Sequence, residues 1–359
     1  MDAYRVFISY SHQDREQATH LVSVLPAGVV PMWDMDLAAG RGFTDQIKAF
    51  IAHSHVFLLF MGANSTDRSS WVHQEIGYAT ALNVPILPVT TGALPSGIIH
   101  TLQAVRLTSD LANASEKLTI GLFEQLVDSA RERPATFECP EDNLRRAMML
   151  AEYAEQVRRM GWYGRLRQKA SLTSFHLPTR GPKDPIWRRY FPAAVHEGPY
   201  LFECLQAERV SLERHARHEG CRLIIDPASE YTRTYGKHGN DSIAARVSTL
   251  LAFLEDRTVE DVRVAVNKDI GRQQSLTVVG DWFSSEAVSS GANRILREAL
   301  FTRHAHTVRE QVREFDDEFH ELLRASGWAE ENSRQRASEY LRSYLDELAG
   351  AQGTPGQLS

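Results

Sequence analysis

The sequence has few cysteines and no long apolar run. Cysteine occurs only at positions 139, 204 and 221, and no two of these residues have the close spacing of a metal-binding pair. An odd number also argues against a disulfide framework and favours a reducing compartment. No apolar stretch reaches the roughly 18 residues that a membrane-spanning helix needs, and no secretory segment opens the chain. We therefore expect a cytoplasmic protein that does not enter a membrane.

The chain also lacks a strong excess of charge of one sign. It has 40 basic and 46 acidic residues, and the formal net charge of −6 at pH 7 argues against a broad nucleic-acid-binding surface, with local basic patches as the alternative. The 14 histidines are scattered and form no pattern with cysteine or carboxylate residues, so we expect no metal site. With 359 residues and 43% hydrophobic residues, the chain is long and apolar enough for two or three folded domains.

Strands and helices alternate in the first third of the chain. Apolar segments predict strands at 5–10, 29–33, 56–61, 84–89 and 102–107, and apolar spacing predicts helices at 18–25, 47–51, 71–82 and 118–131. Segment 56–61 (VFLLFM) is apolar on both faces, as a central parallel strand requires. This order predicts an α/β domain with a parallel five-stranded sheet and helices on both faces. Ligands bind to such sheets beyond the carboxyl ends of the strands.

Trp71 and Glu75 are the main candidates for a site at that edge. They lie four residues apart in a predicted helix, so they share one helix face. Glu75 would reach the reacting atom of a bound ligand, and Trp71 would offer an aromatic face one turn earlier. The alternative is that Glu75 is a surface carboxylate paired with His73 or Arg68.

Several motifs, in the same order as in the family, resemble a TIR domain over residues 4 to about 130. They comprise the strand Phe7-Ile8-Ser9-Tyr10-Ser11 with Asp14 after it, a segment similar to the BB loop with Trp33, Asp34, Leu37, Gly40, Phe43 and Ile47, the helix with Trp71 and Glu75, and the strand Pro85-Ile86-Leu87-Pro88-Val89. The resemblance implies a flavodoxin-like TIR domain at residues 1–133. It also implies one of two functions: some TIR domains are adapters that only bind other TIR domains, and others cleave NAD+ between nicotinamide and ribose.

The enzymatic class has a glutamate at the position of Glu75, which the resemblance therefore implies is catalytic. Nicotinamide leaves oxidised NAD+ as a neutral ring, so the reaction needs no general acid, and one carboxylate can stabilise the oxocarbenium-like ribose. Whether Glu75 acts as nucleophile or as electrostatic stabiliser stays open. NAD+ would be the substrate, and no cofactor is implied. Further residues are implied to line the NAD+ pocket: Tyr10, Ser11, Asp34, Phe43 and Trp71. Alternatively, Ser11 caps the next helix and Phe43 packs the loop.

The rest of the chain predicts a helical, basic connector at 140–184, a second mixed α/β domain with C-terminal helices at 185–349, and a disordered tail at 350–359. Predicted strands lie at 221–225, 262–266 and 275–279. The order of Lys268 and Gly280-Asp281-Trp282 faintly resembles half of a phospholipase-D-like fold. That family has a histidine where Val266 stands, so we expect no phosphodiester hydrolysis.

The expected role of the second domain is that of a sensor. The resemblance to bacterial NAD-cleaving TIR effectors implies a function in antiphage immunity, with self-association through TIR domains and activation by oligomerisation through the C-terminal domain. A nucleotide or another small molecule is the expected activator. Candidate contacts for an anionic ligand are Arg222, Arg263, Lys268 and Arg272, and a surface role is the alternative for each.

Overall fold

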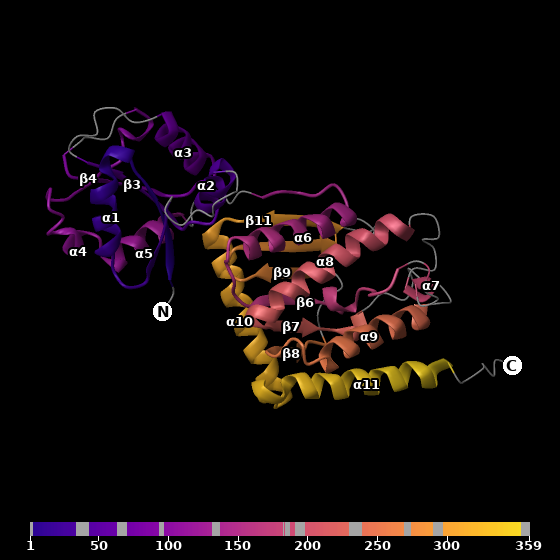
Figure 1. Ribbon diagram of the computed structural model, residues 1–359. Coiled ribbons are helices and arrows are strands. Elements are labelled where there is room, and N and C mark those ends of the chain that lie inside the picture. The colour runs from indigo at the N-terminus through magenta and orange to yellow at the C-terminus, as the bar shows by residue number, and fades with distance from the viewer. Residues whose placement is uncertain are drawn as a thin grey trace. The chain divides into compact units, whose positions relative to one another are not determined.

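The structure, a computed structural model, divides into two compact units (Figure 1). It describes residues 3–33, 43–62, 70–92, 97–130, 137–181, 183, 187–190, 198–229, 239–268, 274–289 and 297–352. The first unit comprises Met1–Phe137 and Thr302–Arg309, and the second comprises Glu138–Phe301 and Glu310–Ser359. Among the described residues, no helix is both long and apolar enough to cross a membrane.

The first unit is built on a parallel sheet with strand order β2-β1-β3-β4-β5 in its described part. Its strands are β1 (Tyr4–Ser9), β2 (Val29–Met32), β3 (Val56–Met61), β4 (Ile86–Thr90) and β5 (Val105–Arg106). Every residue of β1 and β3 is buried, as expected for the central strands of a parallel sheet. The flavodoxin-like, five-stranded fold predicted from the sequence is confirmed.

Helices cover both faces of this sheet. They are α1 (Arg15–Ser23), α2 (Phe43–Ala52), α3 (Ser70–Ala81), α4 (Ala114–Lys117) and α5 (Ile120–Ser129), together with the short turns η1 (His12–Asp14) and η3 (Gly97–Ile99). Alternate strand residues such as Ile8 and Leu58 pack against Leu21 of α1 and Phe123 of α5. The residues between them point to the opposite face, which α2 and α3 cover.

A segment from far along the chain completes the first unit. The guanidinium carbon of Arg309 lies 4.6 Å from the ring centroid of Tyr4, a favourable cation–π geometry. The ring of Tyr4 also meets the ring of His55 edge-on, with the two ring centroids 5.9 Å apart. Residues Thr302–Arg309 are therefore part of the packing of β1, although almost 300 residues separate them in sequence.

Two histidines beside this segment are buried in the neutral form. Burial, reinforced by the positive charge of Arg303, lowers the pKa of His53 to about 3. Burial also holds the pKa of His55 well below its usual range, with further contributions from Arg5 and His306. Both imidazoles have backbone partners, since His53 Nδ1 bonds the carbonyl of its own helix and His55 Nδ1 accepts from the N–H of Arg5 at 3.0 Å.

The second unit contains a mixed sheet with strand order β11-β10-β9-β6-β7-β8 in its described part. The strands are β6 (Leu166–Ala170), β7 (Cys221–Ile225), β8 (Val262–Val266), β9 (Gln274–Val279), β10 (Phe283–Ser289) and β11 (Arg297–Thr302). Strands β6, β7 and β8 are parallel, and β9 pairs antiparallel with β6 and with β10. The prediction of a second, mixed α/β fold with C-terminal helices is confirmed.

The helices of this unit pack on both faces of the sheet. They are α6 (Asn143–Arg159), α7 (Trp187–Tyr190), α8 (Gly198–Glu219), α9 (Gly239–Glu255), α10 (Ala305–Ser326) and α11 (Ser333–Gln352), with the turns η5 (Ser174–His176), η6 (Pro227–Ser229) and η8 (Glu330–Asn332). On one face, Leu223 of β7 packs in a core with α6, α8 and α9. On the other, Ile224 packs against Phe315 and Phe319 of α10.

Residues 140–184, predicted as a connector, belong to the second unit itself. They contribute α6, which packs on α8, and β6, which lies between β9 and β7 in the sheet. On the α10 side of β6, Arg167 donates to Asp316 at 2.8 and 2.9 Å, and Lys169 Nζ lies 2.7 Å from Glu318. The basic character of this segment therefore reflects ion pairs to a helix that covers the sheet.

Candidate functional site

A buried hydrogen bond joins the end of β1 to α3. Ser9 is the last residue of β1, and its Oγ donates to Oε2 of Glu75 at 2.5 Å. The two residues are only 2% and 6% exposed. A buried carboxylate needs such donors, because they offset part of the cost of removing its charge from water. This burial rules out a solvated surface carboxylate as the description of Glu75.

Glu75 lies where the sheet topology favours a ligand. In the strand order β2-β1-β3, the strands β2 and β3 lie on opposite sides of β1. After β1, the chain first forms β2 on one side and then crosses over to form β3 on the other side. The connections therefore diverge beyond the carboxyl ends of β1 and β3, and crevices that bind ligands form at such points. Ser9 ends β1 at this edge, and α3, which carries Glu75, follows the loop after β3.

A second buried carboxylate is tied to the same edge. The N–H of Gly62, directly after β3, donates to Oδ2 of Asp14 at 3.2 Å, and Asp14 is 5% exposed. A Cβ atom on Gly62 would lie 2.0 Å from Oδ1 of Asp14, so a larger residue at this position would displace the Asp14 side chain. The contact fixes the start of the loop that leads to α3 against the turn after β1.

Aromatic rings lie at the ends of the neighbouring strands. Tyr10 follows β1 and Trp33 follows β2, and their ring centroids are 6.3 Å apart with planes inclined by 51°. Both are half-buried and pack against the core under α1 and α5. Trp71, the second residue of α3, is half-buried one turn before Glu75. The predicted ring and carboxylate thus lie on one helix at the ligand edge.

The remaining predicted pocket residues are described only in part. Ser11 stands at the N-cap of η1, where its carbonyl accepts from the N–H of Asp14 at 2.8 Å, but its side chain makes no capping hydrogen bond. Phe43 is the first residue of α2, and its side chain lies outside the described residues, as do Asp34 and Arg68. Their roles in a pocket stay predictions.

Sequence reasoning did not single out Ser9 and Gly62 as site residues. In the sequence, Ser9 is marked by its hydroxyl, which directly follows the apolar residues Val6–Ile8. The alternation of a strand directs Ser9 to the face of the sheet that α3 covers. For Gly62 it was a glycine directly after a wholly buried strand, which often marks a close backbone approach.

The arrangement is suited to stabilising positive charge. Glu75 is fixed and shielded from water, so its effect on a nearby cationic centre is stronger than that of a solvated carboxylate. Within the part of the chain that the structure describes, no three side chains of the types that bind metals come together.

Residues 6–120 match the sequence profile of the TIR domain family. The chain carries a TIR domain. The match spans β2 to β5 and most of β1, and it includes the positions of Ser9, Asp14, Gly62 and Glu75. No curated protein matches the chain. The matched range lies within the first unit, and the second unit lies outside it.

Two of the arginines predicted as ligand contacts in the second unit are engaged in ion pairs. Arg222 lies 2.9 Å from Asp316 and 3.0 Å from Glu330, and Arg263 Nε lies 2.7 Å from Asp261. Both guanidinium groups are therefore engaged by carboxylates of the second unit, whereas Arg272 lies outside the described residues.

Proposed function

We propose that the TIR domain cleaves the bond between nicotinamide and ribose in NAD+, with Glu75 as the catalytic carboxylate. NAD+ is the substrate, and the reaction requires no further cofactor. The observation that carries this proposal is the buried hydrogen bond between Ser9 and Glu75, which orients a shielded carboxylate at the switch point of the sheet.

The chemistry needs little more than a fixed negative charge. When the bond from ribose C1′ to the pyridinium nitrogen breaks, its electron pair neutralises the ring, and nicotinamide departs without being protonated. The positive charge passes to the ribose, where Glu75 stabilises it. Water then adds to C1′ and loses a proton, which gives ADP-ribose, or an adenine nitrogen attacks C1′ instead and gives a cyclic ADP-ribose.

Other side chains would position the substrate. Trp71 offers a ring on which nicotinamide or adenine can stack, and Tyr10 stands at the end of the adjacent strand. Ser11, Asp34 and Phe43 complete the proposed wall of the pocket. Each of these residues would affect substrate binding more than the chemical step.

We further propose that the protein is a cytoplasmic effector of bacterial antiphage immunity. In this proposal, TIR domains self-associate to become active, and the second unit senses a signal that promotes oligomerisation. The separate hydrophobic core of the second unit supports such a division of labour, because a unit with its own core can respond to a ligand as a module.

Replacement of the catalytic carboxylate tests the enzymatic function. Glu75→Gln keeps the size of the side chain and an oxygen that accepts from Ser9, so the fold should survive. We expect release of nicotinamide from NAD+ at high protein concentration to fall at least about 100-fold, because a neutral amide does not stabilise a cation. Glu124→Gln is the matched control, since Glu124 is an exposed glutamate on α5, and it should leave the rate unchanged.

Two results would contradict the proposal in different ways. Full activity of a folded Glu75→Gln variant would remove Glu75 from the mechanism. No nicotinamide release by the wild type at any concentration that permits self-association would favour the alternative function, in which the domain is a TIR adapter that acts only by binding other TIR domains.

A further inference from the structure

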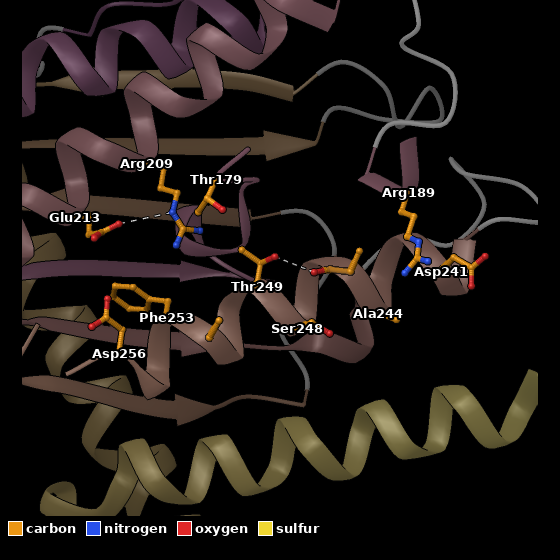
Figure 2. Close-up of a pocket in the computed structure, with 12 residues that line it drawn as sticks. Thr179, Arg189, Arg209, Glu213, Asp241, Ala244, Ser248, Thr249, Phe253 and Asp256 are labelled. Carbon is orange, nitrogen blue, oxygen red and sulfur yellow. Dashed lines mark hydrogen bonds and ion pairs between the residues drawn. The ribbon is translucent and has the colours of Figure 1, made fainter. Parts of the chain in front are cut away.

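The second unit contains a cleft of about 450 Å3 (Figure 2). Helix α9 forms its floor, and α8, α7 and the chain around Thr179 form its walls. Its volume falls within the range of small-molecule sites, which is roughly 300–1,000 Å3.

Small side chains form the floor of the cleft. Ser248 lies four residues after Ala244 and three after Ala245, and Ala252 lies four residues after Ser248, so the four residues share one face of α9. Such a face lets the main chain of a ligand approach closely. At one end the floor is rigid, because the buried ring of Phe253 stacks on Phe175 with centroids 3.9 Å apart and planes within 2°.

Charges of both signs stand at each end of the cleft. Arg189 and Asp241 lie at one end, and Arg209, Glu213 and Asp256 lie at the other (Figure 2).

Arg209 is held in place at its end of the cleft. It is only 6% exposed, and its Nη1 donates to the carbonyl of Leu177 at 2.7 Å and also to that of Phe175. Its Nε lies 3.7 Å from Glu213. A guanidinium fixed in this way needs no reordering when a ligand binds, which lowers the entropic cost of binding.

The balance of these charges disfavours a polyanion. The described lining residues include three carboxylates and two guanidinium groups, and one of the carboxylates, Glu213, also pairs with Arg217 at 2.6 Å. A ligand rich in phosphates would meet as much repulsion as attraction. A ligand that is neutral overall and carries one charge of each sign matches the lining better.

The spacing of the charged ends sets the length of that ligand. Asp256 continues α9, since its N–H donates to the carbonyl of Ala252 at 3.0 Å. Asp241 and Asp256 are fifteen residues apart, which is about 22 Å along a helix. An extended peptide rises about 3.3 Å per residue, so about six or seven residues span this distance.

We propose that the cleft binds a short zwitterionic peptide in an extended conformation. The peptide's charged termini lie at the two ends of the cleft, and its main chain lies over the small residues of α9. This site is separate from the chemistry at Glu75 and does not depend on cleavage of NAD+.

Calorimetric titration of the full chain with the hexapeptide Ala-Ser-Ala-Gly-Ala-Ser tests the proposal. We expect saturable binding of one peptide per chain. Ser248→Trp places an indole in the middle of the floor and should weaken binding more than tenfold. Ser343→Trp is the matched control, because Ser343 is an exposed serine on α11 of the same unit, and it should bind as the wild type does. Thermal unfolding of both variants shows whether each is folded.

Chemical variants of the probe test the role of the termini. Acetylation and amidation of the hexapeptide remove its charges and should weaken binding about twofold to fivefold at each end, as expected for exposed ion pairs. The proposal is overturned if the hexapeptide gives no binding at millimolar concentration, if the capped peptide binds equally well, or if Ser248→Trp binds normally. Binding of adenosine monophosphate in place of the peptide also overturns it. The Glu75→Gln chain should bind the peptide like the wild type, which separates this result from that of the NAD+ assay.

Discussion

Removal of the Ser9 hydroxyl tests how the structure holds its candidate catalytic carboxylate. In Ser9→Ala, Oε2 of Glu75 loses the donor that lies 2.5 Å away, while the backbone of β1 keeps its pairing with β2 and β3. The carboxylate stays buried at 6% exposure, so water cannot simply replace the hydroxyl. The variant thus isolates one hydrogen bond to a buried charge.

The size of the effect follows from the kind of hydrogen bond. A hydrogen bond to a charged group contributes about 1.5–3 kcal/mol, and a buried acceptor that loses its partner costs a similar amount. We expect the free energy of unfolding to fall by about 2 kcal/mol. If Glu75 stabilises the transition state, misorientation of the carboxylate should also lower kcat by about 10- to 100-fold, since each 1.4 kcal/mol changes a rate tenfold.

Two measurements check this prediction independently. Chemical denaturation gives the free energy of unfolding, and nicotinamide release gives kcat and KM for NAD+. We expect kcat to fall with little change in KM, because the hydroxyl acts on the carboxylate and not on the bound dinucleotide.

The control is an exposed serine of the same domain. Ser23 lies on α1, where its hydroxyl donates to the carbonyl of His20 at 2.7 Å, and Ser23→Ala should change stability by less than about 0.5 kcal/mol. A Ser9→Ala variant as stable as the Ser23→Ala variant would refute the reasoning, because it would mean that the buried hydrogen bond contributes nothing.

Three further predictions concern other parts of the structure. Gly62→Ala should lower the free energy of unfolding by roughly 2 kcal/mol or more, because its Cβ would lie 2.0 Å from Oδ1 of Asp14. Gly77→Ala is the control and should not destabilise the protein, because nothing lies within 4 Å of the added Cβ. Chemical denaturation compares the two variants. Burial lowers the pKa of His53 to about 3, so below pH 6.5 the unfolded state binds a proton that the folded state does not. The wild type should therefore lose about 1.4 kcal/mol of stability per pH unit more than His53→Gln between pH 6 and pH 4, as denaturation at several pH values would show. Burial opposes ionisation of Asp316, but hydrogen bonds from two arginines outweigh it and lower the pKa of this carboxyl. The stability that it contributes is full above about pH 4 and is lost below it, so the difference in unfolding free energy between the wild type and Asp316→Asn should shrink in that range.

The fold of the TIR domain was predictable because its central strands have an unambiguous pattern. Segment 56–61 is apolar at every position, which only a strand buried on both faces or a short core helix explains, and the flanking alternation of strands and helices decided between them. The pairing of Ser9 with Glu75 was not predictable. It depends on how far α3 is displaced along the sheet, and nothing in the local sequence specifies this.

The second unit was harder to predict because its strands are stabilised by partners distant in sequence. In β6, Arg167 and Lys169 alternate with buried residues, and both basic side chains pair with acidic residues of α10 some 149 positions later. The segment therefore resembles a basic linker until the covering helix is known. Strands β10 and β11 contain serines or good helix formers, so neither has the apolar pattern of a buried strand.

The contact between Arg309 and Tyr4 has a consequence for how the protein is made. A ribosome releases β1 early, but the segment that packs against its first residue emerges only after the strands of the second unit have been synthesised. The first unit can acquire its sheet during translation, yet its packing is completed only after Arg309 has been synthesised. A nascent or truncated chain that stops before residue 302 would expose Tyr4 and His55 to solvent. A chain with complete packing around β1 is therefore one in which strands β6 to β11 of the second unit have already been synthesised.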